Sequence, residues 1–161
     1  MKVIYPGTFD PPTKGHLSLI TRASALFESV EVAIGIDTEK EPSVCTKEQR
    51  LKFLKELTLD LTNVRVSFFE GLLVNHAKDL GCSLVLRSLR TYTDFEHEKT
   101  LAHTNKKLSG IETIFLLPNE EYQSISSTLI RDIARRGEDL SPFIPETIAS
   151  EVAETLREGL Q

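Results

Sequence analysis

Residues 6–16 read PGTFDPPTKGH, and they directly follow a short apolar run, VIY. The apolar run predicts a strand, while the two prolines prevent a helix from starting before Thr13, which is a good N-cap. The free N–H groups and partial positive charge at such a helix start suit an anion. Gly7 lets the backbone approach a ligand closely, and Gly15 leaves room for one beside His16. The stretch therefore favours a phosphate-binding loop over an ordinary strand-to-helix turn with a surface histidine.

The composition limits the class of protein. The chain has 161 residues, 40% of them hydrophobic, which fits one domain over 1–161 with a sizeable core. A formal charge of −5 argues against broad nucleic-acid or membrane-surface binding. Cys45 and Cys82 form no C-x-x-C pair, so we expect reduced thiols and a cytoplasmic protein. We expect neither a signal peptide nor a membrane-spanning segment.

Strand-like and helix-like patterns alternate along the chain. Strands are predicted at 3–5, 30–36, 64–69, 84–86 and 113–117, and helices at 16–27, 46–57, 72–80, about 94–108, 126–136 and from 145 onward. The inward face of the first helix is predicted to carry Leu19, Ile20, Ala23, Leu26 and Phe27. Five short apolar strands separated by helices predict an α/β fold. Its architecture is a Rossmann-like, doubly wound, five-stranded parallel sheet with helices on both faces, in a single domain.

Ligands of such sheets bind beyond the carboxyl ends of the strands, and three of the loops there carry unusual residues. The first is the stretch 6–16. The second, RSLR at 87–90, supplies two guanidinium groups that suit phosphate, although a solvated loop is the alternative. The third, YQSISSTLIR at 122–131, offers consecutive hydroxyls at a helix start, although simple N-capping would need only one. Three anion-friendly elements on one rim make coincidence much less plausible.

These motifs carry a family resemblance. GTFDP at 7–11 with T-x-G-H at 13–16, and ISST at 125–128 followed by Ile130-Arg131, resemble the two signature motifs of the nucleotidyltransferase superfamily related to class I aminoacyl-tRNA synthetases. Within that superfamily, R-x-L-R at 87–90, D-F-E-x-E at 94–98 and L-A-H-x-N at 101–105 resemble the phosphopantetheine adenylyltransferases, nearly end to end.

The resemblance implies an activity. The enzyme would transfer the adenylyl group of ATP to 4′-phosphopantetheine, giving dephospho-coenzyme A and pyrophosphate. It also implies Mg²⁺ as the cofactor accompanying ATP, small-molecule substrates only, and a homohexamer built as a dimer of trimers. The chain offers no carboxylate cluster dedicated to a metal, which fits a Mg²⁺ ion held mostly by substrate oxygens and water.

The resemblance also assigns roles to individual residues. The catalytic residues would be His16, donating a hydrogen bond to the α-phosphate, and Arg90, holding the β- and γ-phosphates. The contacts with ATP would come from Thr8, Phe9, His16, Ser88, Leu89, Arg90, Glu98, Tyr122, Gln123, Ser124, Ile125, Ser126, Ser127 and Thr128. The contacts with phosphopantetheine would come from Thr8, Lys40, Leu73 and Arg87.

Two positions depart from the family pattern. Ser88 stands where the family has glycine, and it would be strained if its φ were positive. The family's lysine directly precedes a proline, but here Glu41 precedes Pro42 and the lysine is Lys40. Two other functions remain open. One is a nicotinate or nicotinamide mononucleotide adenylyltransferase, which would not explain residues 87–105. The other is a non-catalytic nucleotide-binding protein on the same scaffold.

Overall fold

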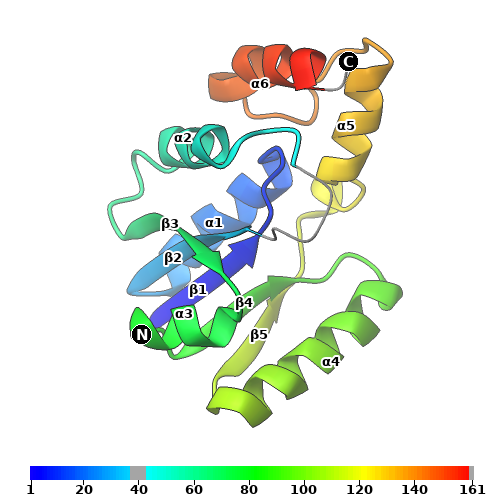
Figure 1. Ribbon diagram of the computed structural model, residues 1–161. Coiled ribbons are helices and arrows are strands. Elements are labelled where there is room, and N and C mark those ends of the chain that lie inside the picture. Colours follow the sequence, from blue (N-terminus) through cyan, green and yellow to red (C-terminus); the bar gives the residue numbers. More distant parts are fainter. Residues whose placement is uncertain (37–42, 160–161) are drawn as a thin grey trace.

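The computed structural model describes residues 1–36 and 43–159. Five parallel strands form one sheet in the order β3-β2-β1-β4-β5 (Figure 1). The strands are β1 (Lys2–Gly7), β2 (Ser29–Ile36), β3 (Val64–Glu70), β4 (Leu84–Ser88) and β5 (Glu112–Leu116). The α-helices are α1 (Lys14–Leu26), α2 (Lys47–Leu57), α3 (Leu73–Asp79), α4 (Tyr92–Ser109), α5 (Ser127–Arg135) and α6 (Glu146–Gly159), with a 3-10 turn η1 (Glu120–Tyr122). The predicted doubly wound α/β sheet is confirmed.

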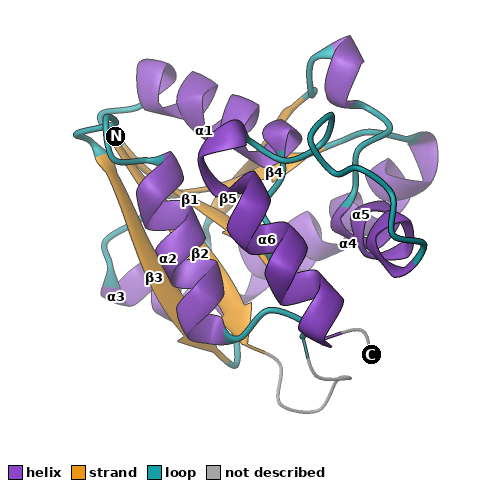
Figure 2. Ribbon diagram, turned by 90° about the horizontal axis from the view of Figure 1, so that it is seen from above, coloured by secondary structure: helices purple, strands orange, loops and turns teal. Residues whose placement is uncertain are grey.

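Helices cover both faces of this sheet (Figure 2). On one face, α1 and α2 bury side chains such as Ile20 and Leu54 against Val32 of β2. On the other face, Val74 of α3 packs with Ile4 of β1. Because both faces are covered, the central strands are buried almost without interruption, as parallel sheets require. None of the described helices combines the length and the apolar character needed to cross a membrane.

The element boundaries follow local signals, with three corrections. Helix α4 begins two residues before the predicted start because the side chain of Thr91 accepts a hydrogen bond from the backbone of Asp94 and caps it. Strand β5 is shifted by one residue, to Glu112–Leu116. The inward placement of Leu26 was wrong, since this last residue of α1 is 63% exposed. The chain leaves the helix at Phe27, in extended conformation, and the Phe27 ring packs against the core instead.

A further cluster of apolar side chains lies beyond the carboxyl ends of the strands. Phe53 of α2 packs there with Ile130 of α5 and Val152 of α6. Figure 1 shows α6 beside both α2 and α5, past the tips of the strand arrows. This packing holds the start of α5 above the same sheet edge at which the loop after β1 and the end of β4 lie.

Candidate active site

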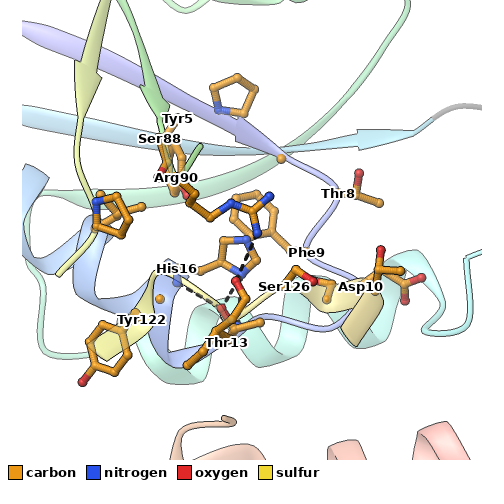
Figure 3. Close-up of a pocket in the computed structure, with 18 of the residues that line it drawn as sticks. Tyr5, Thr8, Phe9, Asp10, Thr13, His16, Ser88, Arg90, Tyr122 and Ser126 are labelled. Atoms are coloured by element: carbon orange, nitrogen blue, oxygen red, sulfur yellow. Dashed lines mark hydrogen bonds between the residues drawn. The ribbon is translucent and has the colours of Figure 1, made fainter. Parts of the chain in front are cut away.

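A cavity of about 570 Å³ lies at the carboxyl ends of the strands. Its wall combines the loop after β1, the end of β4 and the start of α5, which are the three elements that the sequence singled out. It brings together most of the predicted site residues: Thr8, Phe9, His16, Arg87, Ser88, Arg90, Glu98, Tyr122, Ile125, Ser126, Ser127 and Thr128 (Figure 3). The anion-friendly loops therefore meet in one place.

Four other predicted residues are not part of the cavity wall. The backbone of Leu89 continues the pairing of β4 with β5 by donating to the carbonyl of Leu116. Leu73 begins α3 and packs against the core beneath that helix. Gln123 and Ser124 are exposed and lie between wall residues. Lys40 lies outside the described residues.

His16 is fixed at the start of α1 by a reciprocal capping box. The Thr13 hydroxyl oxygen accepts a hydrogen bond from the His16 backbone N–H (3.2 Å), and His16 Nδ1 accepts one from the Thr13 backbone N–H (3.1 Å). A backbone N–H can only donate, so Nδ1 carries no proton. The neutral ring therefore carries its proton on Nε2. The sequence predicted Thr13 as the N-cap. The structure adds that the His16 side chain forms the second hydrogen bond of the capping box, and this bond fixes the tautomer of the ring.

The surroundings of His16 keep it neutral. Its ring meets the ring of Phe9 edge to face, with centroids 4.9 Å apart. Burial lowers the pKa of His16 from 6.5 to about 4, and the positive charge of Arg90 also lowers it. At physiological pH His16 is consequently a neutral hydrogen-bond donor, with Arg90 as the neighbouring cation.

The loop before His16 is shaped by Phe9. Phe9 has a positive φ of 52°, a conformation that side chains larger than glycine's rarely adopt, and its ring is buried. A Cβ atom added to Gly7 would lie 2.8 Å from this ring. The Phe9 ring thus disfavours a side chain at position 7, and the close approach of a ligand to the Gly7 backbone stays a prediction. At Gly15 an added Cβ would meet only ordinary contacts, the nearest at 3.5 Å, so the protein itself does not demand glycine there.

Arg87 and Glu98 form a bidentate ion pair. Arg87 Nε donates to Glu98 Oε2 (2.6 Å) and Nη2 donates to Oε1, while Nη1 donates to the carbonyl of Pro6 (3.1 Å). Glu98 is the only residue of α4 that is buried. The pair fixes the guanidinium plane of Arg87 at the end of β4, and both carboxylate oxygens of Glu98 are committed to it.

Arg90 bridges toward α5. Its Nη1 donates to the carbonyl of Ile125 (3.2 Å), and its Nε lies 3.5 Å from an oxygen of Asp94. Ser88, between the two arginines, ends β4. Its φ is not positive, because Phe9 is the only non-glycine residue with a positive φ in 1–36 and 43–159. Serine in place of the family's glycine therefore causes no backbone strain.

The start of α5 faces the cavity. The Ser126 hydroxyl oxygen accepts a hydrogen bond from the Leu129 N–H (3.1 Å), so Ser126 is the cap. Ser127 instead donates to the carbonyl of Pro11 (2.8 Å) and ties α5 to the first loop. One hydroxyl thus caps the helix, and the next joins the two signature motifs.

The cavity wall also contains charged residues to which the sequence assigned no role: Asp10, Asp94, Arg131 and Arg135. Asp10 and Arg131 belong to the two signature motifs, which was the available signal. Arg131 donates to the backbone carbonyl of Asp10 and lies 3.7 Å from its carboxylate. The structure describes no cluster of three or more His, Cys, Asp or Glu side chains that could hold a metal ion among residues 1–36 and 43–159.

Comparison with known proteins agrees with this geometry. The cytidylyltransferase-like family model matches residues 4–133. Phosphopantetheine adenylyltransferases from Finegoldia magna and from Caldanaerobacter subterraneus subsp. tengcongensis are each 42% identical, over 94% and 97% of this chain and 93% and 98% of theirs. The chain belongs to the phosphopantetheine adenylyltransferase family. A third member, from Flavobacterium psychrophilum, is 45% identical over 91% of this chain and 97% of its own length.

Solved structures outside this family share the fold. A Vibrio parahaemolyticus protein assigned as a nicotinate-nucleotide adenylyltransferase superimposes with a TM-score of 0.67 over 99% of this chain and 93% of its own, at 24% identity. A lipopolysaccharide core biosynthesis protein from Thermoplasma volcanium gives a TM-score of 0.54 over 74% and 96%, at 17% identity. Identities this low support the nucleotidyltransferase-type fold and nothing finer.

Proposed function

We propose that this protein transfers the adenylyl group of ATP to 4′-phosphopantetheine, giving dephospho-coenzyme A and pyrophosphate. The observation that carries the proposal is one cavity in which His16, Arg90 and the N-terminus of α5 converge. The identity of 42–45% with phosphopantetheine adenylyltransferases, over almost the whole chain, supports the choice of acceptor.

The reaction needs no protein nucleophile, because a phosphate oxygen of the acceptor attacks the α-phosphorus of ATP and pyrophosphate leaves. Catalysis then consists of positioning the two substrates and stabilising spread negative charge. We assign the Nε2–H of His16 to the α-phosphate, with the N-terminus of α1 behind it. The capping box supports this role, because it leaves Nε2 as the proton-bearing nitrogen.

The remaining roles follow the motifs. We assign Arg90, with the start of α5, to the β- and γ-phosphates of ATP, and Arg87 with Thr8 to the phosphate of phosphopantetheine. The bidentate contact with Glu98 supports the role of Arg87, because it holds the guanidinium in one plane. The remaining ATP contacts, to which we assign Glu98, Leu89, Gln123 and Ser124 among others, and the phosphopantetheine contacts of Lys40 and Leu73, stay predictions from the family resemblance.

Mg²⁺ is proposed as the metal that accompanies ATP. The cavity carboxylates are engaged elsewhere: Glu98 by Arg87, Asp10 by backbone N–H groups and Asp94 by Arg90. This donor set fits an ion held by phosphate oxygens and water, approached by few protein oxygens. The ion would supply charge neutralisation on the leaving pyrophosphate.

Three wider proposals accompany the activity. A homohexamer, arranged as a dimer of trimers, is supported by the apolar side chains that α4 leaves exposed, Tyr92, Phe95, Leu101 and Leu108. A cytoplasmic location is supported by two free, buried cysteines. We also propose that residues 1–161 act as one domain, because the cavity takes residues from β1 through α5. Light scattering on the purified protein would give about six times 18.1 kDa for a hexamer.

An acceptor panel tests the activity. The protein is incubated with ATP and Mg²⁺ and with either 4′-phosphopantetheine, nicotinate mononucleotide or nicotinamide mononucleotide, and pyrophosphate release is measured. Only phosphopantetheine is expected to support turnover, and a preference for a mononucleotide would refute the proposed acceptor. ATP formation from dephospho-coenzyme A and pyrophosphate eliminates a non-catalytic nucleotide-binding protein.

A further inference from the structure

Asp10 has a buried carboxylate to which the proposed reaction assigns no role. The residue is 4% exposed and lies in the cavity wall. Its Oδ1 accepts a hydrogen bond from the Cys45 backbone N–H (2.7 Å), and its Oδ2 accepts one from the Val44 backbone N–H (3.0 Å). One carboxylate thus satisfies two consecutive backbone donors from a segment more than thirty residues away in sequence.

The segment that Asp10 holds forms part of the cavity rim. Ser43 and Val44 line the cavity, and Cys45 is buried among the side chains that pack α2 against α5 and α6. Thr46 then caps α2. The two hydrogen bonds to Asp10 therefore attach residues 44 and 45 to the loop after β1, next to the cavity.

The loop that carries Asp10 is itself rigidly held. Arg50, also buried, donates to the carbonyl of Thr8 (2.9 Å), and Arg131 donates to the carbonyl of Asp10. Ser127 donates to the carbonyl of Pro11, the next residue. These hydrogen bonds reach backbone atoms, and Arg131 also forms an ion pair with the Asp10 carboxylate, at 3.7 Å. The carboxylate is thus a fixed support, and what it supports is the segment at 43–45.

We propose that Asp10 is a positioning residue whose carboxylate holds residues 43–45 against the cavity, beside the loop that carries Thr8. The position of this segment would set the affinity for the acceptor phosphate. The inference rests on the proposed function for the identity of the acceptor. Asp10 acts through the backbone of Val44 and Cys45 and does not touch the reacting atoms.

Asp10→Asn tests the support with little change in size. An amide side chain offers one acceptor oxygen and one NH₂ group, so either Val44 or Cys45 would direct its N–H at a donor. A buried unsatisfied donor of this kind corresponds to roughly a 10- to 100-fold effect. We expect the KM for phosphopantetheine to rise by about that factor. The KM for ATP should change less than about threefold, because Asp10→Asn removes the ion pair with Arg131 but keeps the hydrogen bonds from Ser127 and Arg131 of α5 to the backbone carbonyls of residues 11 and 10.

Cys45 provides a readout that does not depend on activity. Its thiol is fully buried, and its pKa is raised mainly by this burial and further by the Asp10 carboxylate. In a Cys82→Ser background Cys45 is the only cysteine. Its fully buried thiol can react with 5,5′-dithiobis(2-nitrobenzoate) only in an opened form that has left Asp10, so the labelling rate reports on opening of the segment and not on the pKa of the closed form. We expect Asp10→Asn to speed this labelling by roughly 10-fold or more, in line with the loss of a buried hydrogen bond.

Asp139→Asn is the matched control. Asp139 also accepts a backbone hydrogen bond, from the Ser141 N–H (2.9 Å), but it is exposed and lies outside the cavity wall. This variant is expected to change neither the KM for phosphopantetheine nor the labelling of Cys45.

The outcomes separate the two proposals. Unchanged labelling of Cys45 in Asp10→Asn would show that the carboxylate does not hold the segment. Faster labelling with an unchanged KM for phosphopantetheine would show that the support has no role in acceptor binding.

If the variant does not fold, hydrogen exchange in the wild type decides. The Val44 and Cys45 amides must be protected, with further protection on adding phosphopantetheine but not ATP, and the absence of either effect overturns the proposal. A wild type that fails to adenylylate phosphopantetheine refutes the proposed function alone, because the labelling result stands without it.

Discussion

Replacing His16 by alanine isolates the hydrogen bond on which the proposed chemistry depends. The neutral imidazole presents one N–H to the cavity, at Nε2, since Nδ1 accepts from the Thr13 backbone. Removing a single donor aimed at a developing negative charge costs about 3–4 kcal/mol, which is roughly a 10²- to 10³-fold loss in kcat. Because the bond strengthens mainly in the transition state, the KM for ATP should change little.

The same variant has a structural cost that must be separated from the catalytic one. Alanine leaves the Thr13 N–H without the Nδ1 acceptor, but the other half of the capping box, from the backbone N–H of residue 16 to the Thr13 hydroxyl, remains. Loss of half a cap corresponds to about 1 kcal/mol or less in unfolding free energy. Thermal unfolding measured beside the kinetics would show whether the variant is folded at the assay temperature.

Initial rates of pyrophosphate release, at saturating phosphopantetheine and varied ATP, give kcat and KM for wild type and variant. His97→Ala serves as the control, because His97 is exposed on α4 and lies outside the cavity wall. A second check is the pH profile: with a pKa of about 4, His16 is about 97% neutral at pH 5.5, so its ionisation should not lower kcat between pH 5.5 and 8. An unchanged kcat in His16→Ala would refute the reasoning.

Three further predictions follow from the same contacts. Arg87→Ala should raise the KM for phosphopantetheine and leave Glu98 as a buried carboxylate without its partner; weaker ATP binding alone would contradict the assignment. Gly7→Ala should destabilise the fold by roughly 1–3 kcal/mol, measured by urea unfolding, because the new Cβ would lie 2.8 Å from the Phe9 ring, and full stability would contradict this packing. Burial lowers the folded-state pKa of His16 to about 4 from 6.5, so between these values the unfolded chain binds a proton that the folded chain does not. Stability should accordingly fall as the pH drops from about 6.5 to 4, by up to about 3 kcal/mol, and unfolding curves of His16→Gln should show a weaker dependence in that window.

The sheet and its helices were predictable because their signals are local. Proline, threonine and glycine mark where helices begin and end. Thr13 caps α1 as the sequence predicted, and Thr46 and Gly110 mark the start of α2 and the end of α4 in the structure. Leu26 was misplaced because a helical repeat does not show where the chain turns away from the core. That turn depends on Phe27, whose extended conformation is a property of the tertiary packing.

The site was predictable as a set of loops but not as a set of contacts. Motif spacing located the residues of the cavity wall, since parallel strands end at one edge. It could not show that the Phe9 ring lies against Gly7, nor that the Asp10 carboxylate accepts hydrogen bonds from Val44 and Cys45. Those pairings join positions that no periodicity relates. Whether position 88 needs glycine likewise depends on one φ angle, which only the structure gives.

The charges of the described cavity wall explain why positioning must dominate this chemistry. They comprise four arginines and three carboxylates: Arg87, Arg90, Arg131, Arg135, Asp10, Asp94 and Glu98. His16 adds no charge because it is neutral. So small an excess of positive charge cannot neutralise a nucleoside triphosphate and a second phosphate by Coulomb attraction alone. Instead the carboxylates accept hydrogen bonds from other parts of the wall: Glu98 from the Arg87 guanidinium, and Asp10 from the backbone at 44–45. In the proposed reaction, donors held in place in this way lose little entropy on binding and need not reorganise as charge develops on the phosphates. We therefore expect the cavity to favour the transition state through geometry more than through net charge.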